Sequence, residues 1–259
     1  MQLVVLGSGT TVPHPQRAAS AYWLQTEKIS LLLDAGADTS HRLAQENLDW
    51  HTLDLIWISH FHLDHVGGLP PFLFNLKYAP QTQSRRKPLI ICGPRGTKDL
   101  LQAFDGANDY KLFEQKFPVE IREVAPREEF DLLPGLQAET FSTPHTSESL
   151  ALRLTDEQER TLLYTSDTGY TDALADFAHG VDLLLMECSF PQNKPVETHL
   201  ELTDAMRIAN DADPRRMVLT HLYPQWDELN LAAEARGAWA GETIEARDGL
   251  RLEVASAGG

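Results

Sequence analysis

The feature that most constrains this chain is a cluster of three histidines and one aspartate at residues 60–65, where the sequence reads HFHLDH. Neutral imidazole and carboxylate groups are ligands for zinc and similar divalent ions. No cysteine lies in the cluster, which excludes an all-thiolate structural zinc site. A set of nitrogen and oxygen ligands with room for water indicates a catalytic, hydrolytic metal site.

The surroundings of this cluster place it at the end of a strand. An apolar run over residues 54–59 predicts a strand that stops at the first histidine, and Gly67 and Gly68 then open a predicted helix. The cluster is therefore expected on a loop at the carboxyl end of a strand, the usual place of a site in a layered α/β protein. Three more polar residues directly follow predicted strands: His145, Asp167 and His221. Because one sheet edge can gather several strand ends, we expect these three to join the cluster.

The remaining pattern predicts an α/β fold with many short strands. Thirteen runs rich in Val, Ile and Leu and bounded by Gly, Pro or Asp predict strands: residues 3–6, 21–26, 29–34, 54–59, 89–92, 119–124, 137–142, 150–154, 161–166, 181–187, 217–220, 243–246 and 250–254. Six segments between them predict helices: residues 39–48, 67–78, 96–104, 171–178, 203–210 and 228–239. Thr171 and Thr203 are expected N-caps, and Asp248-Gly249 predicts a tight hairpin between the last two strands. Early strands in hairpin-like pairs and later strands alternating with helices predict two sheets packed face to face, with helices outside.

Length, composition and charge narrow the function classes. The 259 residues, 42% of them hydrophobic, suffice for a core, and we expect a single domain over residues 1–259. The apolar start of the chain is too short for a secretory signal and the run 181–186 is too short to span a bilayer, which predicts a cytoplasmic protein without a membrane partner. The formal net charge of -16 repels polyanions and disfavours long nucleic acid as a partner. Cys92 and Cys188 lie in apolar runs and are expected as buried, unpaired thiols.

Seven residues in this order resemble the ligand set of the metallo-β-lactamase superfamily: His60, His62, Asp64, His65, His145, Asp167 and His221. The resemblance extends over residues 7–224 and implies a four-layer αββα sandwich with a dinuclear metal centre at one edge of the sheets. By the same resemblance, one ion takes His60, His62 and His145. The second ion takes Asp64, His65 and His221, and Asp167 bridges the two. The expected cofactors are two divalent ions, zinc first, with manganese or iron as alternatives, and a hydroxide shared by the ions is the expected nucleophile.

Within this superfamily the sequence favours phosphodiester hydrolysis. True β-lactamases mostly carry cysteine where this chain has Asp167, and the flavodiiron redox branch carries an acid where this chain has His62. The N-terminal segment 7–13 with Arg17, and the segment 166–169, resemble the corresponding parts of ribonuclease Z. These features predict a ribonuclease Z-like hydrolase.

Two residues are expected to take part in the chemistry itself. In ribonuclease Z, a histidine at the place of His199 contacts the scissile phosphate, which implies that His199 is a general acid. The usual pattern has threonine two positions after that histidine, whereas this chain has Glu201. Asp64, expected as a metal ligand, is also expected to orient the attacking water or accept its proton.

A short substrate is expected instead of tRNA. Ribonuclease Z carries a long arm that grips the tRNA elbow, inserted between the third histidine motif and the bridging aspartate, whereas His145 and Asp167 are only 22 positions apart. Segments 186–191 and 199–202 also resemble the cyclic-phosphate phosphodiesterase of the carbon–phosphorus lyase pathway, but this chain lacks the cysteine-rich zinc site of that enzyme. We therefore expect a small phosphodiester or a short nucleotide as the substrate.

Two other functions are compatible with the same ligand set. A lactone or thioester hydrolase would differ only in the substrate pocket, and a metal-binding protein without turnover would keep the ions alone. A homodimer is expected by analogy with relatives. Tyr223 and Trp226 follow His221 closely and are candidates for the wall of the substrate pocket, and His14 is the remaining histidine expected nearest the cleft.

Overall fold

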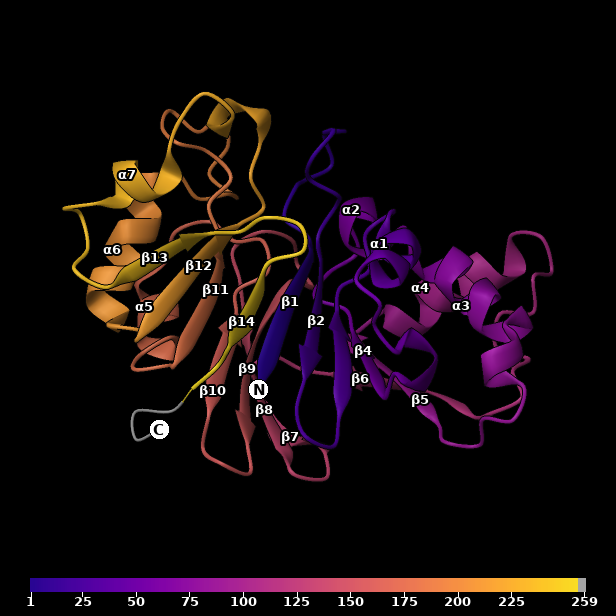
Figure 1. Ribbon diagram of the computed structural model, residues 1–259. Coiled ribbons are helices and arrows are strands. Elements are labelled where there is room, and N and C mark those ends of the chain that lie inside the picture. Colours follow the sequence, from indigo (N-terminus) through magenta and orange to yellow (C-terminus); the bar gives the residue numbers. More distant parts are fainter. Residues whose placement is uncertain (256–259) are drawn as a thin grey trace.

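Two seven-stranded sheets packed face to face form the centre of the molecule in the computed structural model, which describes residues 1–255 (Figure 1). In spatial order, the first sheet contains β14 (Arg251–Glu253), β1 (Gln2–Gly7), β2 (Ala21–Gln25), β3 (Ser30–Leu33), β4 (Leu55–Trp57), β5 (Leu89–Pro94) and β6 (Val119–Val124). The second sheet contains β13 (Glu242–Glu245), β12 (Arg216–Thr220), β11 (Leu183–Glu187), β10 (Thr161–Tyr164), β9 (Leu150–Asp156), β8 (Leu136–Ser142) and β7 (Glu129–Leu133).

Helices cover the outer face of each sheet (Figure 1). Beside the first sheet lie α1 (Thr39–Gln45), α2 (Leu63–Val66), α3 (Leu69–Tyr78) and α4 (Thr97–Gly106), and beside the second lie α5 (Asp172–Phe177), α6 (Leu202–Ala212) and α7 (Leu231–Ala235). Phe72 of α3 shares a buried cluster with Ile56 of the first sheet, and Ile208 of α6 shares another with Leu219 of the second. Three 3-10 turns complete the elements: Trp50–Thr52, Pro80–Thr82 and Pro224–Trp226. The resulting order of helices, sheet, sheet and helices confirms the predicted αββα sandwich.

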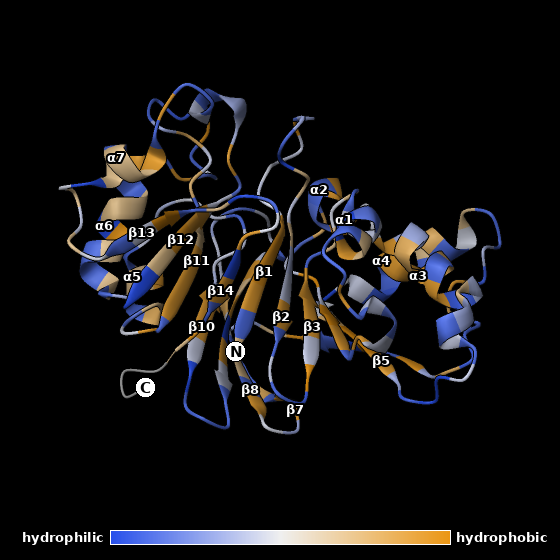
Figure 2. Cartoon of the chain, in the orientation of Figure 1, coloured by the Kyte–Doolittle hydropathy of each residue, from blue (hydrophilic) through white to orange (hydrophobic). Residues whose placement is uncertain are grey.

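Central strands such as β1, β3 and β11 have nearly continuous apolar sequences because both of their faces are buried (Figure 2). In β3, Leu31 and Leu33 point into the core between the sheets, whereas Leu32 belongs to the cluster under the helices. This alternation is the period-two pattern of a strand. Each polar residue that follows such a strand is therefore carried to the rim of the sandwich.

Parallel strands position the site at one edge of the sandwich. In the first sheet, β3, β4, β5 and β6 run parallel, and in the second sheet β10, β11, β12 and β13 do so. The carboxyl ends of parallel neighbours meet at the same edge. The segments after β4, β10 and β12 begin at such ends and carry the predicted ligand residues other than His145, which follows β8, a strand with antiparallel neighbours. No helix within residues 1–255 is long and apolar enough to cross a membrane.

The predicted hairpin at Asp248-Gly249 is wrong. A turn does form there, since Leu250 N donates to Arg247 O at 2.9 Å, and Gly249 takes the positive φ of 88° that favours glycine. However, β13 pairs with β12 in the second sheet, whereas β14 pairs with β1 in the first. The turn therefore carries the chain from one sheet to the other.

Two further expectations about elements need correction, and one strand was missed. The sequence did not predict β7, an edge strand in which charged residues alternate with apolar ones. Thr203 does not cap α6, because the N-cap is Glu201, which forms a capping box with Asp204. Thr171 does occupy the N-cap position of α5, as predicted, although its side chain makes no capping hydrogen bond. The predicted helix over residues 228–239 shrinks to α7, which ends before Gly237 with its φ of 90°.

Candidate metal centre

The six-residue cluster divides between a loop and a short helix. His60 and His62 lie on the loop after β4, as predicted, whereas Asp64 and His65 belong to the single turn of α2. Backbone hydrogen bonds tie this turn to the loop after β3, because Ala35 N donates to His65 O at 2.7 Å and Gly68 N donates to Ala35 O at 2.8 Å. The two loops approach so closely that a Cβ atom on Gly68 would lie 2.1 Å from a backbone oxygen. Only glycine fits there.

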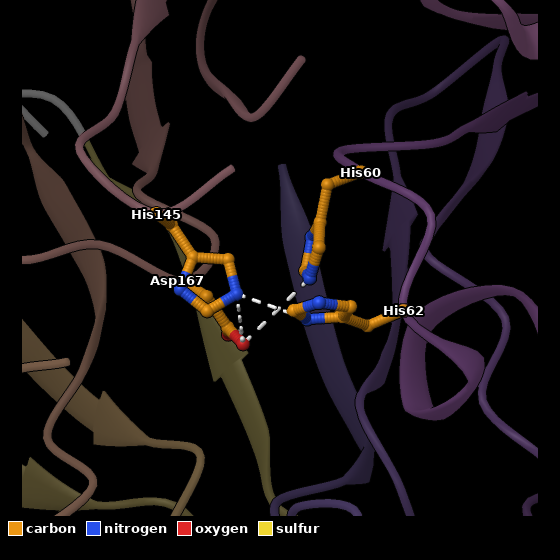
Figure 3. Close-up of side chains that lie close together, drawn as sticks. All are labelled: His60, His62, His145 and Asp167. Carbon is orange, nitrogen blue, oxygen red and sulfur yellow. Dashed lines mark hydrogen bonds and ion pairs between the residues drawn. The ribbon is translucent and has the colours of Figure 1, made fainter. Parts of the chain in front are cut away.

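The other three predicted residues join this cluster from the second sheet. His145 follows β8, Asp167 follows β10 and His221 follows β12. Ligand atoms within 4.8 Å of one another form three overlapping groups: His60, His62, His145 and Asp167; Asp64, His65 and His221; and Asp167, His199 and His221. Figure 3 shows the first of these groups, in which the side chains from the two sheets converge. The structure thus brings together all seven residues singled out as ligands, with His199 beside them.

Asp167 occupies the central position in the cluster. Its Oδ2 lies 3.8 Å from Nε2 of His60 and 3.6 Å from Nε2 of His145. On the other side, its Oδ1 lies 3.3 Å from Nε2 of His65, and its Oδ2 lies 3.4 Å from Nε2 of His221. A carboxylate placed between two sets of imidazole nitrogens is positioned to bind a cation in each set.

Positive backbone φ angles aim three of the polar residues at the strand ends. Asp34, Ser166 and His221 each have φ of 56°, in the left-handed region that non-glycine residues rarely adopt. Each such residue costs about 1–2 kcal/mol. Strained backbone of this kind clusters at functional sites, where the surrounding structure holds it in place.

The unsatisfied nitrogens of the cluster fit a divalent cation. Nε2 of His60 and Nε2 of His65 are buried and have no hydrogen-bond partner within residues 1–255. Leaving a buried polar atom unpaired costs about 1–3 kcal/mol. Nδ1 of His62 and Nε2 of His145 lie 3.0 Å apart (Figure 3). Cations coordinated by these nitrogens would satisfy all of them, and the nitrogen and oxygen donors match the preferences of zinc.

Burial and neighbouring charges adapt the side chains to this role. Burial, with the charge of His65 beside it, holds the pKa of His60 well below its usual range, which keeps the imidazole neutral. Burial alone would raise the pKa of Asp167, but the nearby His221 and His65 hold it well below its usual range. Neutral imidazole and ionised carboxylate are the forms that bind a metal ion.

A buried aspartate that the sequence analysis missed supports the residues that the first sheet contributes to the cluster. Asp34, which is fully buried, accepts hydrogen bonds from Ser59 N at 2.8 Å, Ser59 Oγ at 2.7 Å and Tyr164 OH at 2.6 Å. It also lies 2.7 Å from Nδ1 of His65, so the opposite ring nitrogen faces Asp167. The available signal was a carboxylate directly after the apolar run of β3.

A buried glutamate, also missed, has the corresponding position in the second sheet. Glu187 is the last residue of β11 and accepts from Thr168 N at 2.7 Å, Ser189 Oγ at 2.6 Å and Leu200 N at 3.2 Å. Its Oε1 lies 2.9 Å from Nδ1 of His199. Burial lowers the pKa of His199, but the hydrogen bond and charge of Glu187 outweigh this effect and raise it to about 9. The signal was again a carboxylate that ends an apolar strand.

His199 lies beside both sets of ligand residues. Its ring centroid is 4.8 Å from that of His145, and it stacks on His221 at 5.3 Å. Tyr223 lies next to this group, 6.0 Å from the His221 ring and stacked on Phe190 at 4.7 Å. This arrangement leaves His199 at the rim of the cluster.

Three other sequence expectations have clear outcomes. Trp226 is largely buried, its Nε1 donates to Cys188 O at 2.8 Å, and its remaining surface lines a pocket beside His14 and Asp227. His14 is outside the ligand groups found within residues 1–255, and its Nε2 lies 3.1 Å from Asp227. Cys92 and Cys188 are buried free thiols, as predicted.

Comparison with known proteins identifies relatives of this chain. The family model described as Anti-Pycsar protein Apyc1 matches residues 1–239. Ribonuclease Z of Ignicoccus hospitalis is 28% identical over 278 residues, covering 88% of this chain and 90% of that protein. The metallo-hydrolase YhfI of Bacillus subtilis is 29% identical over 256 residues, covering 98% of this chain and all of that protein.

Solved structures show the same fold. The crystal structure of YhfI, a metallo-beta-lactamase fold protein, has a TM-score of 0.81 at 26% identity and covers 97% of this chain and 98% of that chain. A diphosphatase of the PhnP family has a TM-score of 0.75 at 21% identity and covers 97% of each chain. Together these likenesses confirm the resemblance to the metallo-β-lactamase superfamily and its ribonuclease Z-like branch.

Proposed function

The chain belongs to the Anti-Pycsar protein Apyc1 family, and we propose that it is a ribonuclease Z-like phosphodiesterase that works with two zinc ions. It is a metal-dependent hydrolase of that branch, as its relatives and its histidine and aspartate groups indicate. The observation that carries the finer proposal is the position of Asp167, with imidazole nitrogens of His60, His145, His65 and His221 within 4 Å of its carboxylate.

The proposed ligand assignment follows the two groups of side chains. His60, His62 and His145 would hold one ion. His62 would contribute Nδ1, the atom that faces Nε2 of His145. Asp64, His65 and His221 hold the second ion, and Asp167 contacts both. Imidazole and carboxylate ligands favour zinc, with manganese and iron as alternatives. When bound, two such ions lower the pKa of water and neutralise the charge of a phosphodiester.

The residues around the ions supply proton transfer. Glu187 fixes His199 through Nδ1, so that Nε2 is the nitrogen free to donate a proton to the leaving oxygen of a phosphodiester. Asp64 lies beside His221, with its Oδ2 3.4 Å from Nε2 of that residue. There it can orient the attacking water or accept its proton.

The shape of the second sheet supports a short substrate. His145 and Asp167 are 22 positions apart, and the segment between them contains β9 and β10, which pair antiparallel as a hairpin. No arm for gripping a long nucleic acid extends from this segment, which lies wholly within the described residues. With the net charge of -16, this favours a small phosphodiester or a short nucleotide. A cytoplasmic location and a homodimer stay predictions from the sequence.

A substrate panel tests the proposed activity. Protein loaded with two equivalents of zinc is expected to hydrolyse bis-p-nitrophenyl phosphate and at least one cyclic nucleotide. It should leave homoserine lactones and glutathione thioesters unchanged. Turnover of a lactone or thioester alone would assign the chain to the other hydrolase class. Tight zinc binding with no turnover of any compound would make it a metal-binding protein, and either result overturns the phosphodiesterase proposal.

A matched pair of variants tests the role of His199. His199→Ala should keep both ions and lower turnover about 10²–10⁴-fold, because only the proton donor is lost. His179→Ala removes an exposed histidine on the far side of α5 and should behave like the parent protein. If His199→Ala loses one ion, His199 is a ligand and not the general acid.

A further inference from the structure

Two buried serines stand between the carboxylates and the histidines of the cluster. Building on the proposed metal centre, we propose that Ser59 and Ser189 are positioning residues that hold His60 and His221 in the Nδ1–H tautomer. In this tautomer the lone pair of each ring lies on Nε2, the atom that faces Asp167. Both serines contact the ligand groups only through histidine rings, and Ser189 also contacts that of His199.

The hydroxyl group of Ser59 has one proton, and it donates this proton in a hydrogen bond to a carboxylate. Ser59 is fully buried, and its Oγ donates to Oδ2 of Asp34 at 2.7 Å. Asp34 is the acceptor in this hydrogen bond and not the donor, because it also accepts hydrogen bonds from Ser59 N and Tyr164 OH. The same Oγ lies 3.0 Å from Nδ1 of His60. Since the hydroxyl has no second proton, this contact is a hydrogen bond only if Nδ1 of His60 is the donor.

The same argument holds in the second half of the molecule. The Oγ of Ser189, also fully buried, donates to Oε2 of Glu187 at 2.6 Å. It lies 3.0 Å from Nδ1 of His221 and 3.2 Å from Nδ1 of His199. Nδ1 of His199 has its own acceptor in Glu187, and the two lone pairs of the serine oxygen can receive the remaining donors. His221 must therefore donate from Nδ1.

The consequence is a chain of fixed hydrogen-bond directions from carboxylate to ligand atom. A metal-binding histidine has its tautomer set by the hydrogen bond of the other ring nitrogen. In each half a carboxylate holds one histidine directly and a second one through a serine: His65 and His60 for Asp34, and His199 and His221 for Glu187. Without the serine, the Nε2–H form, which cannot bind a cation through Nε2, becomes accessible to the second histidine.

Ser166 provides an internal comparison for His60. Its Oγ lies 3.3 Å from Nδ1 of His60, but it has no carboxylate partner among its contacts within residues 1–255. Its hydroxyl is thus free to act as donor or acceptor and does not impose a tautomer. We expect Ser166→Ala to affect His60 less than Ser59→Ala does.

Imidazole ¹H–¹⁵N correlation spectra of the zinc-free protein test the proposal without any turnover. In the parent protein, His60 and His221 should appear as Nδ1–H tautomers. Ser59→Ala should shift His60, and Ser189→Ala should shift His221, towards the Nε2–H form. Ser20→Ala is the matched control, since Ser20 is equally buried but donates to the backbone oxygen of Gly9. It should leave both rings unchanged.

Zinc affinity, measured by competition with a chromophoric chelator, is the second readout. Ser59→Ala and Ser189→Ala should each weaken zinc binding about 10–100-fold, and Ser20→Ala should not. Nε2–H tautomers in the parent protein, a measurement that needs no variant to fold, would overturn the proposal. So would folded serine variants with unchanged tautomers and unchanged affinity. If the tautomers and affinities follow the prediction while phosphodiesters are untouched, the proposed function fails and this inference stands.

Discussion

The two halves of the molecule, each formed by one sheet and its helices, arrange the same types of residue around one site. They leave different residues accessible. In the first half, Asp34 and the histidine it holds, His65, are both fully buried, and that ring is enclosed between Asp34 and Asp167. In the second half, Glu187 holds His199, which is 9% exposed and lies at the rim. In the proposed assignment, the first half therefore supplies only metal ligands, whereas the second half also supplies the proton donor His199.

Removal of the ions should have the largest effect on both halves. Dialysis against a chelator is expected to abolish phosphodiester turnover and lower the melting temperature, because the buried Nε2 atoms of His60 and His65 are left unpaired. Addition of zinc should restore both properties, as followed by turnover and thermal unfolding. Turnover that survives complete removal of metal would contradict the proposed centre.

Exchanging the two carboxylates for amides should separate the halves. Asp34→Asn is expected to weaken zinc binding about 10–100-fold, because it disturbs His65 and, through Ser59, His60. Glu187→Gln should weaken zinc binding less than Asp34→Asn does, because through Ser189 it disturbs only one ligand, His221. It should lower turnover about 10²–10⁴-fold, because His199 loses the partner that orients it. Zinc titration and turnover of the same samples measure both effects.

A third carboxylate serves as the control for this pair. Asp182 is also buried and accepts from Thr161 N at 2.8 Å and from the hydroxyl of that residue at 3.1 Å. It lies where β10 and β11 begin, at the other ends of these strands from Asp167 and Glu187. Asp182→Asn should change stability without changing zinc affinity or turnover. If Glu187→Gln loses zinc while Asp34→Asn keeps it, the assignment of the two halves is reversed.

The turn that joins the halves should make a smaller contribution. The carboxylate of Asp248 accepts from Ser8 N, Ser8 Oγ and Ala18 N at 2.8–2.9 Å, which fixes the N-terminal loop against the crossing between the sheets. Asp248→Ala is expected to lower the free energy of unfolding by about 1–3 kcal/mol, measured by urea denaturation. Asp227→Ala, which removes an exposed carboxylate on the neighbouring loop, should change it little. Equal effects would show that the crossing is not specifically stabilised.

The smallest effect is expected from thiol reagents. Burial raises the pKa of the Cys92 thiol to about 12, and burial, with the charge of Glu187 nearby, raises that of Cys188 well above its usual range. Since the thiolate is the reactive form, neither cysteine should react with a thiol reagent at neutral pH in the folded protein. Both should react in denaturant. Selective labelling of Cys188 in the native protein would show that the second half opens.

The sequence was most informative where function and strand ends coincide. His145, Asp167 and His221 were placed in the site because each closely follows a predicted strand, and the fold does bring the ends of β8, β10 and β12 together. The αββα order and most strands were also predicted, because strands buried on both faces have a continuous apolar sequence. The pattern that reveals a buried strand therefore also reveals what stands at its end.

Features that depend on distant partners were not predicted. Asp34 and Glu187 resemble ordinary strand-end acids, and their importance comes from Ser59, Tyr164 and Ser189, which only the fold brings near. The hairpin expected at Asp248-Gly249 failed because turn chemistry is local, whereas the sheet that each strand joins is not. Edge strand β7 was missed because its exposed charged residues remove the apolar signal.

Anomalous diffraction at the zinc absorption edge, on crystals of zinc-loaded protein, tests the central claim most directly. Two peaks about 3.5–4 Å apart are expected, one among His60, His62 and His145 and the other among Asp64, His65 and His221. The carboxylate of Asp167 should lie between them. A single peak, or a pair that Asp167 does not join, would contradict the two-ion centre on which the proposed phosphodiesterase rests.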